Sequence, residues 1–469
     1  GGSQEDGRFF PGSMTINIRL IAHLQGLLLL IMGLIIPLGI PFSLYHGGND
    51  IFSLLSSGLI SIMIGLGILL ICGPSLDYKE LRKRESYLSV TLSWVIISMI
   101  GSLPFMIHGS IPTFTDAFFE TVSGFTTTGA TVLTDIEALP HGLLFWRSMT
   151  HWLGGMGVIV FSLAILPLLG VGGSELFTAE ISGPTKDKVH PQVAGTAKRL
   201  WAAYVFLTLL HTVALLFCDM TLFDAVCHAM STMGTGGFST RNDSMAAFSP
   251  AAQYVVMVFM FLAGVNFSLH YHALIKGRIS AYRNDEEFKF YTFVVLVNVL
   301  FISVTVFLFS DLGAERSFRD GAFQVISLIT STGYVTADYE SFAPYTRFVF
   351  FVFLFTGACA GSTTGAIKMV RLLILSKNGL LEFRKMLHPR AVIPVRYNQR
   401  AVPQHVLHNI LAFFVLYMVI FLNGSLLMSL LGLDFASAMG SVAASLGSIG
   451  PGIGVVGGFS TYTLIPDLG

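Results

Sequence analysis

The chain has 469 residues, of which 53% are hydrophobic and only 12% charged. Because soluble domains carry about twice that share of charged residues, the composition excludes a soluble globular protein and predicts a polytopic membrane protein. Lys and Arg number 27, as do Asp and Glu, and the formal net charge of zero argues against nucleic-acid binding. Residues 1–13, GGSQEDGRFFPGS, are interpreted as a cloning-derived leader before a natural start at Met14.

Apolar runs dominate the rest of the chain. Nine runs of about 19 or more residues contain no Asp, Glu, Lys or Arg, and each is long enough to cross a hydrocarbon core of about 30 Å as a helix. These runs are 20–46, 51–76, 86–115, 148–174, 200–218, 244–275, 290–310, 348–367 and 401–433. The four cysteines, Cys72, Cys218, Cys227 and Cys359, lie in or beside them without metal-ligand spacing, so neither disulfides nor a zinc site is expected.

The basic residues predict the orientation of these spans. Four segments, 77–87, 175–199, 276–289 and 368–400, hold 4, 4, 4 and 8 Lys and Arg residues. Since basic loops remain in the cytoplasm, these segments and the N-terminus are predicted to be cytoplasmic. Segment 368–400 is expected to contact either anionic lipid head groups or a cytosolic partner, and "ISGPTKDKVHPQVAGTAKR", 181–199, is the second partner candidate.

One short pattern occurs four times on the predicted outer side: "FTDAFFETVSGFTTTGAT", "LFDAVCHAMSTMGTGGFS", "FRDGAFQVISLITSTGYV" and "FASAMGSVAASLGSIGPG". A glycine follows an Asp or Ser by 13, 12, 13 and 13 residues, the pairs being Asp116 and Gly129, Asp224 and Gly236, Asp320 and Gly333, and Ser437 and Gly450. The Asp and Ser residues are predicted helix N-caps. The apolar dozen that follows makes a helix of roughly 18 Å, which crosses half a bilayer and must be re-entrant.

Backbone beyond a half-helix is tolerated at membrane depth only where it is buried in protein or lines a watery cavity. Four Gly-containing strands can turn their carbonyl oxygens toward one axis and replace the water shell of a potassium ion, and the half-helices direct their negative ends to the same point. The predicted selectivity filter comprises Thr127, Thr128, Gly129, Thr235, Gly236, Ser331, Thr332, Gly333, Ser448, Ile449 and Gly450. Potassium is expected at Thr128, Gly129, Thr235, Gly236, Thr332, Gly333, Ile449 and Gly450.

Close helix packing is the alternative role of these glycines, and it suits "GGMG", 154–157, better. The predicted fold is therefore an all-α polytopic membrane protein. Four pseudo-symmetric units, each a helix, a re-entrant pore helix and a second helix, surround one pore and follow two extra N-terminal helices. The boundaries are 14–80 for the N-terminal pair and 81–185, 186–285, 286–385 and 386–469 for the units.

The segment "GACAGSTTGAIK" interrupts the second helix of the third unit with small and polar residues. Broken helices at the midplane mark ion paths or gates, and a close-packed helix is the alternative. Lys368 either repels a cation from the closed pore or extends to the cytoplasmic interface. The candidate gate comprises Gly357, Ala358, Cys359, Ala360, Gly361, Ser362, Thr363, Thr364, Gly365 and Lys368.

Other polar residues at membrane depth allow further interpretations. His151, His211, His228 and His270 form either a proton relay or, more commonly, packing contacts. Asp135, Asp243 and Asp338 follow the filter glycines and either concentrate cations in an outer vestibule or are solvated loop acids. A membrane hydrolase is the alternative from another functional class, but no Ser, His and acid set stands at usable spacing, so no catalytic residue is predicted.

The chain resembles the TrkH/KtrB/HKT superfamily of potassium transporters, and its two extra N-terminal helices resemble the TrkH membrane subunits of bacterial Trk systems. The resemblance covers nearly all of 14–469 and is carried by "TDAFFETVSGFTTTGAT", "WLGGMGVIVFSLAILPLLGVGG", "GGFSTRND", "GACAGSTTGAIKMVRLL" and "GSIGPGIG". It implies that the four glycines are filter residues selecting potassium over sodium. It also implies that 357–368 is an intramembrane loop that obstructs the pore below the filter.

The same resemblance implies a location in the bacterial inner membrane, a homodimer and a cytosolic ring of TrkA-type regulatory subunits. Potassium would be the substrate, and nucleotide would bind only to the regulatory partner, so this chain is expected to hold no cofactor. The family's fourth unit closes with a second helix. After the last predicted filter segment, Ser448, Ile449 and Gly450, the sequence contains only "PGIGVVGGFSTYTLIPDLG". That helix is therefore expected to be missing from the sequence. A symporter that couples potassium to sodium or protons is the alternative mechanism.

Overall fold

The computed structural model describes residues 16–73, 83–157, 193–274, 276–387, 393–466 and 469. Several expectations lie outside this part of the chain: the leader at 1–13, most of the basic segments 77–87 and 175–199, and the apolar run 148–174 beyond residue 157.

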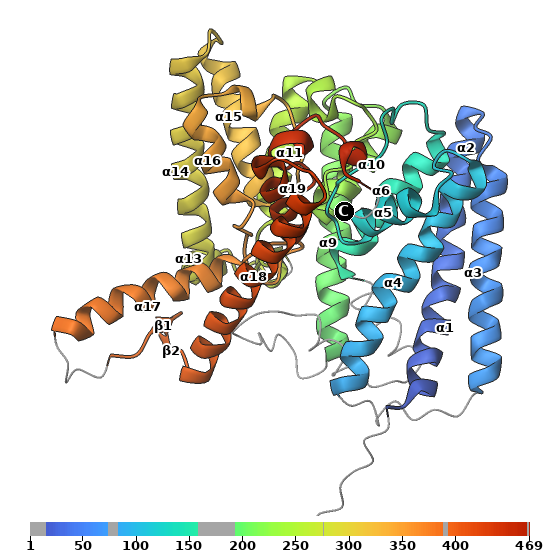
Figure 1. Ribbon diagram of the computed structural model, residues 1–469, viewed down its shortest axis with the longest axis horizontal. Helices are drawn as coiled ribbons and strands as arrows, with labels where there is room; N and C mark the ends of the chain where they lie inside the picture. The colour runs from blue at the N-terminus through green and yellow to red at the C-terminus, as the bar shows by residue number, and fades with distance from the viewer. Residues whose placement is uncertain (1–15, 74–82, 158–192, 275, 388–392, 467–468) are drawn as a thin grey trace, which may run out of the picture.

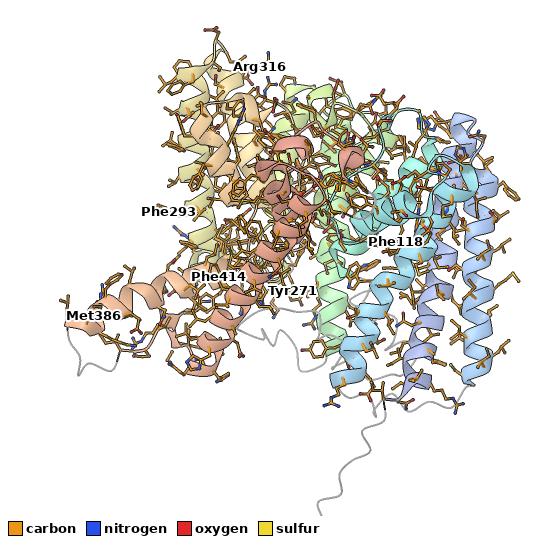
Figure 2. The ribbon with its side chains drawn as sticks, in the orientation of Figure 1. Phe118, Tyr271, Phe293, Arg316, Met386 and Phe414 are labelled. Carbon is orange, nitrogen blue, oxygen red and sulfur yellow. The ribbon has the colours of Figure 1, made fainter. Side chains whose placement is uncertain are left out.

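Six helices within the described residues are long and apolar enough to cross a membrane. Only 22–39% of the most apolar window of each is buried inside the protein. Their outward side chains, such as Phe293, therefore need a lipid environment (Figure 2). The six are α1 Ile18–Ile35, which continues through the 3₁₀ turn η1 Ile36–Gly39 into α2 Ile40–His46, then α3 Ile51–Cys72, α4 Lys83–His108, α9 Val193–Leu216, α14 Glu286–Phe309 and α18 Gln404–Leu430.

Two of the nine predicted spans are not continuous helices. The run 244–275 divides into η4 Ser244–Ala247, α11 Pro250–Ala263 and α12 Phe267–Leu274, and the last two are bent by 103°. The run 348–367 contains only the end of α16 Pro344–Phe353, after which the chain is irregular up to α17 Met369–Leu387. Small and polar residues at both breaks permit main-chain turns that a span of large apolar residues does not make.

Four short helices correspond to the four copies of the repeat. They lie well above the lower ends of α3 and α4 (Figure 1). A second helix follows each of the first three, and the 3₁₀ turns η6 Gly454–Val456 and η7 Tyr462–Leu464 follow the fourth. The short helices are α5 Phe114–Phe125, α10 Leu222–Gly234, α15 Ala314–Ile329 and α19 Phe435–Gly447, and the second helices are α6 His141–Gly155, α11 and α16.

The predicted N-caps of these helices are wrong by three residues in three copies and by seven in the third. In the first and second copies the caps are Thr113 and Thr221, whose hydroxyls accept the N–H of Asp116 and Asp224 at the third helical position. The fourth copy has Asp434 as its cap, three residues before the predicted Ser437. Asp116 and Asp224 accept the cap hydroxyls in return, so both acids belong to reciprocal capping pairs. In the third copy α15 begins earlier, at Ala314 after Gly313, and Asp320 lies inside the helix.

Helix α17 and one small pair of strands lie on the side opposite the short helices (Figure 1). There α17 projects away from the bundle (Figure 1). The antiparallel strands β1 Arg396–Tyr397 and β2 Arg400–Ala401 pair Arg396 with Ala401 and are a small departure from an all-α fold. The short helix α13 Ser280–Asn284 and the 3₁₀ turn η5 Tyr339–Ser341 complete the described set.

Glycines bring α1 and α3 into close contact. A Cβ atom on Gly33 would lie 2.7 Å from the carbonyl oxygen of Gly58, and one on Gly65 would lie 2.8 Å from that of Gly26. The pairs are one heptad apart on each helix, which is the small-residue packing expected between membrane helices. The backbones can approach this closely only because neither helix carries a side chain at these points.

We expect Gly58→Leu to force α1 and α3 apart and to lower the free energy of unfolding by about 1–3 kcal/mol, the usual effect of overpacking. Gly67→Leu on the same helix is the matched control, since a Cβ there meets no atom within 4 Å. Thermal unfolding in detergent compares the two. An equal loss in both variants would contradict the packing interpretation.

Candidate functional site

The four copies of the repeat end in the same unusual backbone turn. One of the first two residues after each short helix has a left-handed conformation, with φ between 51° and 55°, although none of the four is glycine. These residues are Thr127, Thr235, Ser331 and Ser448. A left-handed Thr or Ser costs conformational energy, and such strain persists only where the surroundings impose it. Its fourfold recurrence indicates that the turn shape has a role of its own.

Hydrogen bonds fix the register of the four turns. In each copy one N–H donates to the carbonyl five residues earlier, in the last turn of the short helix, over 2.8–3.0 Å. The donors are Thr128, Gly236, Thr332 and Ile449. The next residue is in every case a glycine, and those at 129, 237 and 333 have φ of 80–82°.

The second glycine of the set is therefore Gly237, one residue after the predicted Gly236. Counting from Asp224 now gives an offset of 13, equal to the offsets in the other three copies. The sequence "TGGF" contains two adjacent glycines, and only the backbone conformation separates them. When the copies are aligned by backbone conformation, the equivalent strand segments are Thr127–Gly129, Thr235–Gly237, Ser331–Gly333 and Ser448–Gly450.

The four glycines are neighbours in cyclic order. A Cβ atom on Gly129 would lie 1.9 Å from the carbonyl oxygen of Gly236, and one on Gly237 would lie 2.1 Å from that of Thr332. One on Gly333 would lie 3.1 Å from the nitrogen of Gly450, and one on Gly450 would lie 2.7 Å from the carbonyl oxygen of Gly129. The fourth strand thus returns to the first. Main chain meets main chain at each junction, so a side chain has no room there.

Each copy of the repeat forms, with the loop that follows it, one quarter of the ring. Hydrogen bonds behind the glycines link three of the four pairs of neighbouring quarters. The Tyr334 hydroxyl donates to the Phe238 carbonyl over 3.2 Å, joining the third strand to the second. The Tyr339 hydroxyl donates to the Gly452 carbonyl, joining the third quarter to the fourth. The Tyr462 N–H donates to the Thr131 carbonyl over 2.9 Å and closes the fourth quarter onto the first.

Two cavities lie against the ring. The first, of about 130 Å³, is lined by the four glycines, by Arg147 and by residues of the loops that follow the strands. The second, of about 330 Å³, is lined by the left-handed residues Thr127 and Ser448 and by residues 361–365 and Lys368. Since the glycines and the left-handed residues are two positions apart on the same strands, the strands lie between the two cavities.

The irregular segment between α16 and α17 forms a loop that is closed at its base. Thr356 and Ile367 form a parallel bridge, and the Gly357 N–H donates to the Ile367 carbonyl over 2.9 Å. At the tip, the Gly365 N–H donates to the Ser331 hydroxyl over 2.8 Å, and the Thr363 hydroxyl donates to the Met233 carbonyl over 3.1 Å. The continuous close-packed helix considered as an alternative for 357–368 is therefore wrong.

Two charged residues hold this loop. Glu287 is 3% exposed, and one of its carboxylate oxygens accepts the N–H groups of Ala360 and Val370 over 2.7 and 2.9 Å. The Lys368 ammonium donates to the carbonyl and to the hydroxyl of Thr364. Lys368 thus curls back onto its own loop beside the second cavity.

The four membrane histidines all lie against aromatic rings. Their ring centroids are 3.9–5.4 Å from those of the neighbouring phenylalanines, in the pairs His151 and Phe238, His211 and Phe259, His228 and Phe248, and His270 and Phe267. His151 also bonds to Ser231, and His270 to Tyr282 and Leu262. These separate sets of partners favour packing over a relay.

Two of the three outer acids lie in turns, and Asp135 also accepts from the Asn242 amide over 3.0 Å. Asp135 and Asp338 accept the N–H two residues further along the chain, at Glu137 and Glu340, which is a turn-capping arrangement. A Cβ atom on Gly154 would lie 2.0 Å from the Phe125 carbonyl oxygen. This close approach to the end of the first short helix agrees with the packing role predicted for the "GGMG" segment.

Two functional candidates were missed by sequence reasoning. Glu120 and Arg147 form an ion pair of 2.7 Å behind the first two strands. They stand in "FFETVSGF" and "LFWRSMTHW", and a charged residue within such apolar surroundings is a signal that could have found them.

Known proteins resemble this chain over nearly its whole length. Residues 58–465, which contain all four copies of the repeat, match the family TrkH, described as cation transport protein. The Trk system potassium uptake protein TrkH of Salmonella typhimurium is 38% identical over 448 residues, which cover 94% of this chain and 92% of that protein. The Trk system potassium uptake protein TrkG of Escherichia coli strain K12 is 33% identical over 457 residues, covering 97% and 93%. The crystal structure of the potassium transporter TrkH from Vibrio parahaemolyticus superposes with a TM-score of 0.86 at 32% identity, covering 97% of this chain and 94% of that chain.

Proposed function

Because the chain belongs to the TrkH family of cation transport proteins, we propose that it takes up potassium across a bacterial inner membrane as the membrane subunit of a Trk system. Membership in this family makes the chain a transporter and not an enzyme. The observation that carries the proposal is the cyclic order of Gly129, Gly237, Gly333 and Gly450 between two cavities. Bare main chain on four strands supplies the carbonyl oxygens with which a filter replaces the hydration shell of potassium.

In this proposal the filter comprises the four strand segments in their structural register, 127–129, 235–237, 331–333 and 448–450. Their glycines face neighbouring strands, and the last-turn carbonyls of α5, α10, α15 and α19 are directed toward the strands, as the hydrogen bonds from the four turns indicate. The negative ends of these helices favour a cation at the ring and disfavour an anion. Four unequal units, bounded as 81–185, 186–285, 286–385 and 386–469, would surround the pore, with 14–80 as an N-terminal addition.

The loop 357–368 is proposed as the gate below the filter. Its tip is bonded to Ser331 and Met233, which lie at the ends of the third and second short helices, and it lines the second cavity. Displacement of the tip would widen the route from the filter to the cytoplasm. Lys368 would add a positive charge beside that route while the loop is closed.

The proposed partners are a second copy of the chain and cytosolic TrkA-type subunits, with nucleotide bound only by the latter. The described part of the cytoplasmic segment 368–400 carries exposed apolar residues on α17, such as Met386, beside basic ones (Figure 2). This combination suits contact with lipid or with a regulatory subunit.

We expect the reconstituted protein to pass potassium selectively in liposomes. In a pure channel the reversal potential shifts by about 59 mV for each tenfold potassium gradient, and it is unaffected by sodium or proton gradients. A reversal potential that follows sodium or pH would instead identify a coupled symporter. Absence of cation flux in liposomes that contain the folded protein and its regulatory subunit would contradict the proposal.

A further inference from the structure

The ion pair between Glu120 and Arg147 lies directly behind the outer end of the filter. Both side chains are buried, at 1% and 2% exposure. The Arg147 Nε donates to Glu120 Oε1 over 2.7 Å. Burying two charges is costly unless their remaining donors and acceptors are also satisfied, so the other partners of the pair indicate what it holds.

Those partners are the strands of two different quarters. Glu120 accepts the Thr131 hydroxyl over 2.9 and 3.0 Å and the Val132 N–H over 3.0 Å. Arg147 donates from Nη1 to the Ser239 carbonyl over 3.1 Å, and its guanidinium carbon lies 3.5 Å from the centre of the Phe238 ring. Thr131 and Ser239 each stand two residues beyond a ring glycine. The pair therefore ties the first strand to the second at the same height.

The residues equivalent to Glu120 in the other copies of the repeat show whether its bracing role is shared. The residues four positions after Asp116, Asp224, Asp320 and Ser437 are Glu120, His228, Gln324 and Ser441. His228 bonds to the Ser239 hydroxyl over 3.0 Å, and Gln324 donates to the Ala337 carbonyl over 3.3 Å. Thus three of the four short helices brace the strand that returns from their own glycine.

In the fourth copy Ser441 bonds instead within its own helix, to the Ala438 carbonyl over 3.2 Å. The strand there is held by other groups. The Tyr462 hydroxyl donates to the Gly450 carbonyl over 2.8 Å, and Glu340 accepts the Gly454 N–H over 2.8 Å. Among the four equivalent positions, the first copy alone uses a charged residue.

We infer that the Glu120–Arg147 pair is a positioning element for ion selectivity, which holds the first two filter strands at a fixed separation. The inference rests on the proposed function. Charge-assisted hydrogen bonds are shorter and stronger than neutral ones, so they resist the small strand displacements that let a filter fit a smaller ion. The pair is also neutral overall. Since Arg147 lines the cavity that contains the four glycines, an unpaired guanidinium there would repel incoming cations.

Glu120→Gln and Arg147→Gln test the inference. Glu120→Gln nearly preserves the size of the side chain, and Arg147→Gln shortens it. Each substitution removes one charge. We expect both to lower the potassium-to-sodium permeability ratio by roughly tenfold, the size of effect that loss of one charged hydrogen bond produces. Arg147→Lys keeps the charge but cannot reach both Glu120 and Ser239 with one planar group, so an intermediate ratio is expected.

The exposed pair of Arg241 and Glu137 is the matched control. It also connects the first two quarters, with N and O atoms 3.1 Å apart, but its side chains are 43% and 45% exposed. Arg241 lines the same cavity as Arg147. Arg241→Gln and Glu137→Gln therefore reproduce the change of charge near the ring without loosening the strands, and they should keep the wild-type ratio.

Two results would overturn the inference in a protein whose wild type is potassium-selective. They are wild-type ratios in both Gln variants and an equal loss of selectivity in the exposed control. Wild-type ratios accompanied by opposite changes in potassium flux would show that the pair acts only through its charge. If the Gln variants fail to give monodisperse protein, Arg147→Lys decides, since a wild-type ratio in that variant is equally contrary. A wild type that does not select potassium would instead contradict the proposed function.

Discussion

Gly129→Ser is expected to lower the potassium-to-sodium permeability ratio by at least roughly tenfold, corresponding to about 1.4 kcal/mol of lost discrimination. Gly129 has φ of +81°, a conformation that residues with a Cβ atom rarely adopt, and its Cβ position is 1.9 Å from the Gly236 carbonyl oxygen. The serine must push that carbonyl out of the ring or change its own backbone conformation. Either response alters the spacing of the oxygens that replace potassium's water shell.

Reversal potentials with potassium on one side of the membrane and sodium on the other measure the ratio. Gly237→Ser should have the same effect, because Gly237 has φ of +82° and its Cβ would lie 2.1 Å from the Thr332 carbonyl oxygen. Gly67→Ser is the matched control on α3, where a Cβ atom meets nothing within 4 Å. An unchanged ratio in both ring variants would remove the filter assignment.

Deletion of 357–364 is expected to raise potassium flux in the absence of the regulatory partner. The deletion removes the loop tip and its hydrogen bond from Thr363 to the Met233 carbonyl, together with the bond from Ala360 to Glu287. With a net contribution of about 0.5–1.5 kcal/mol for each hydrogen bond, losing two or three shifts the closed-to-open equilibrium by roughly tenfold or more. Initial rates of rubidium or potassium entry into proteoliposomes provide the measurement.

Thr363→Val is a milder form of the same test. It removes the hydroxyl that donates to Met233 and accepts from Thr235 while preserving the length of the loop. The matched control is Thr356→Val at the base of the loop, since within the described part of the chain the Thr356 hydroxyl donates to the Val352 carbonyl of the preceding helix alone. Flux equal to wild type in both the deletion and Thr363→Val would exclude 357–368 as the gate.

The sequence alone determined the membrane class and the number of repeats. Long apolar runs predict lipid-facing helices, because the transfer of a helix from water into lipid depends on its local composition. The fourfold pattern was equally visible, since each copy needs a short helix followed by small residues. The helix break near Gly357 could also be predicted from the sequence, because consecutive small and polar residues interrupt the apolar run there.

The tertiary structure decided what depends on contacts between distant segments. The choice between Gly236 and Gly237 required the backbone register, since two adjacent glycines are equivalent until one of them faces the next strand. The capping pair of Thr113 and Asp116 displaced a cap that composition alone favoured at the acid. The partnership of Glu120 with Arg147 arises only when α5 and α6 pack side by side, because charges pair through space, whereas spacing along the chain records only local preferences.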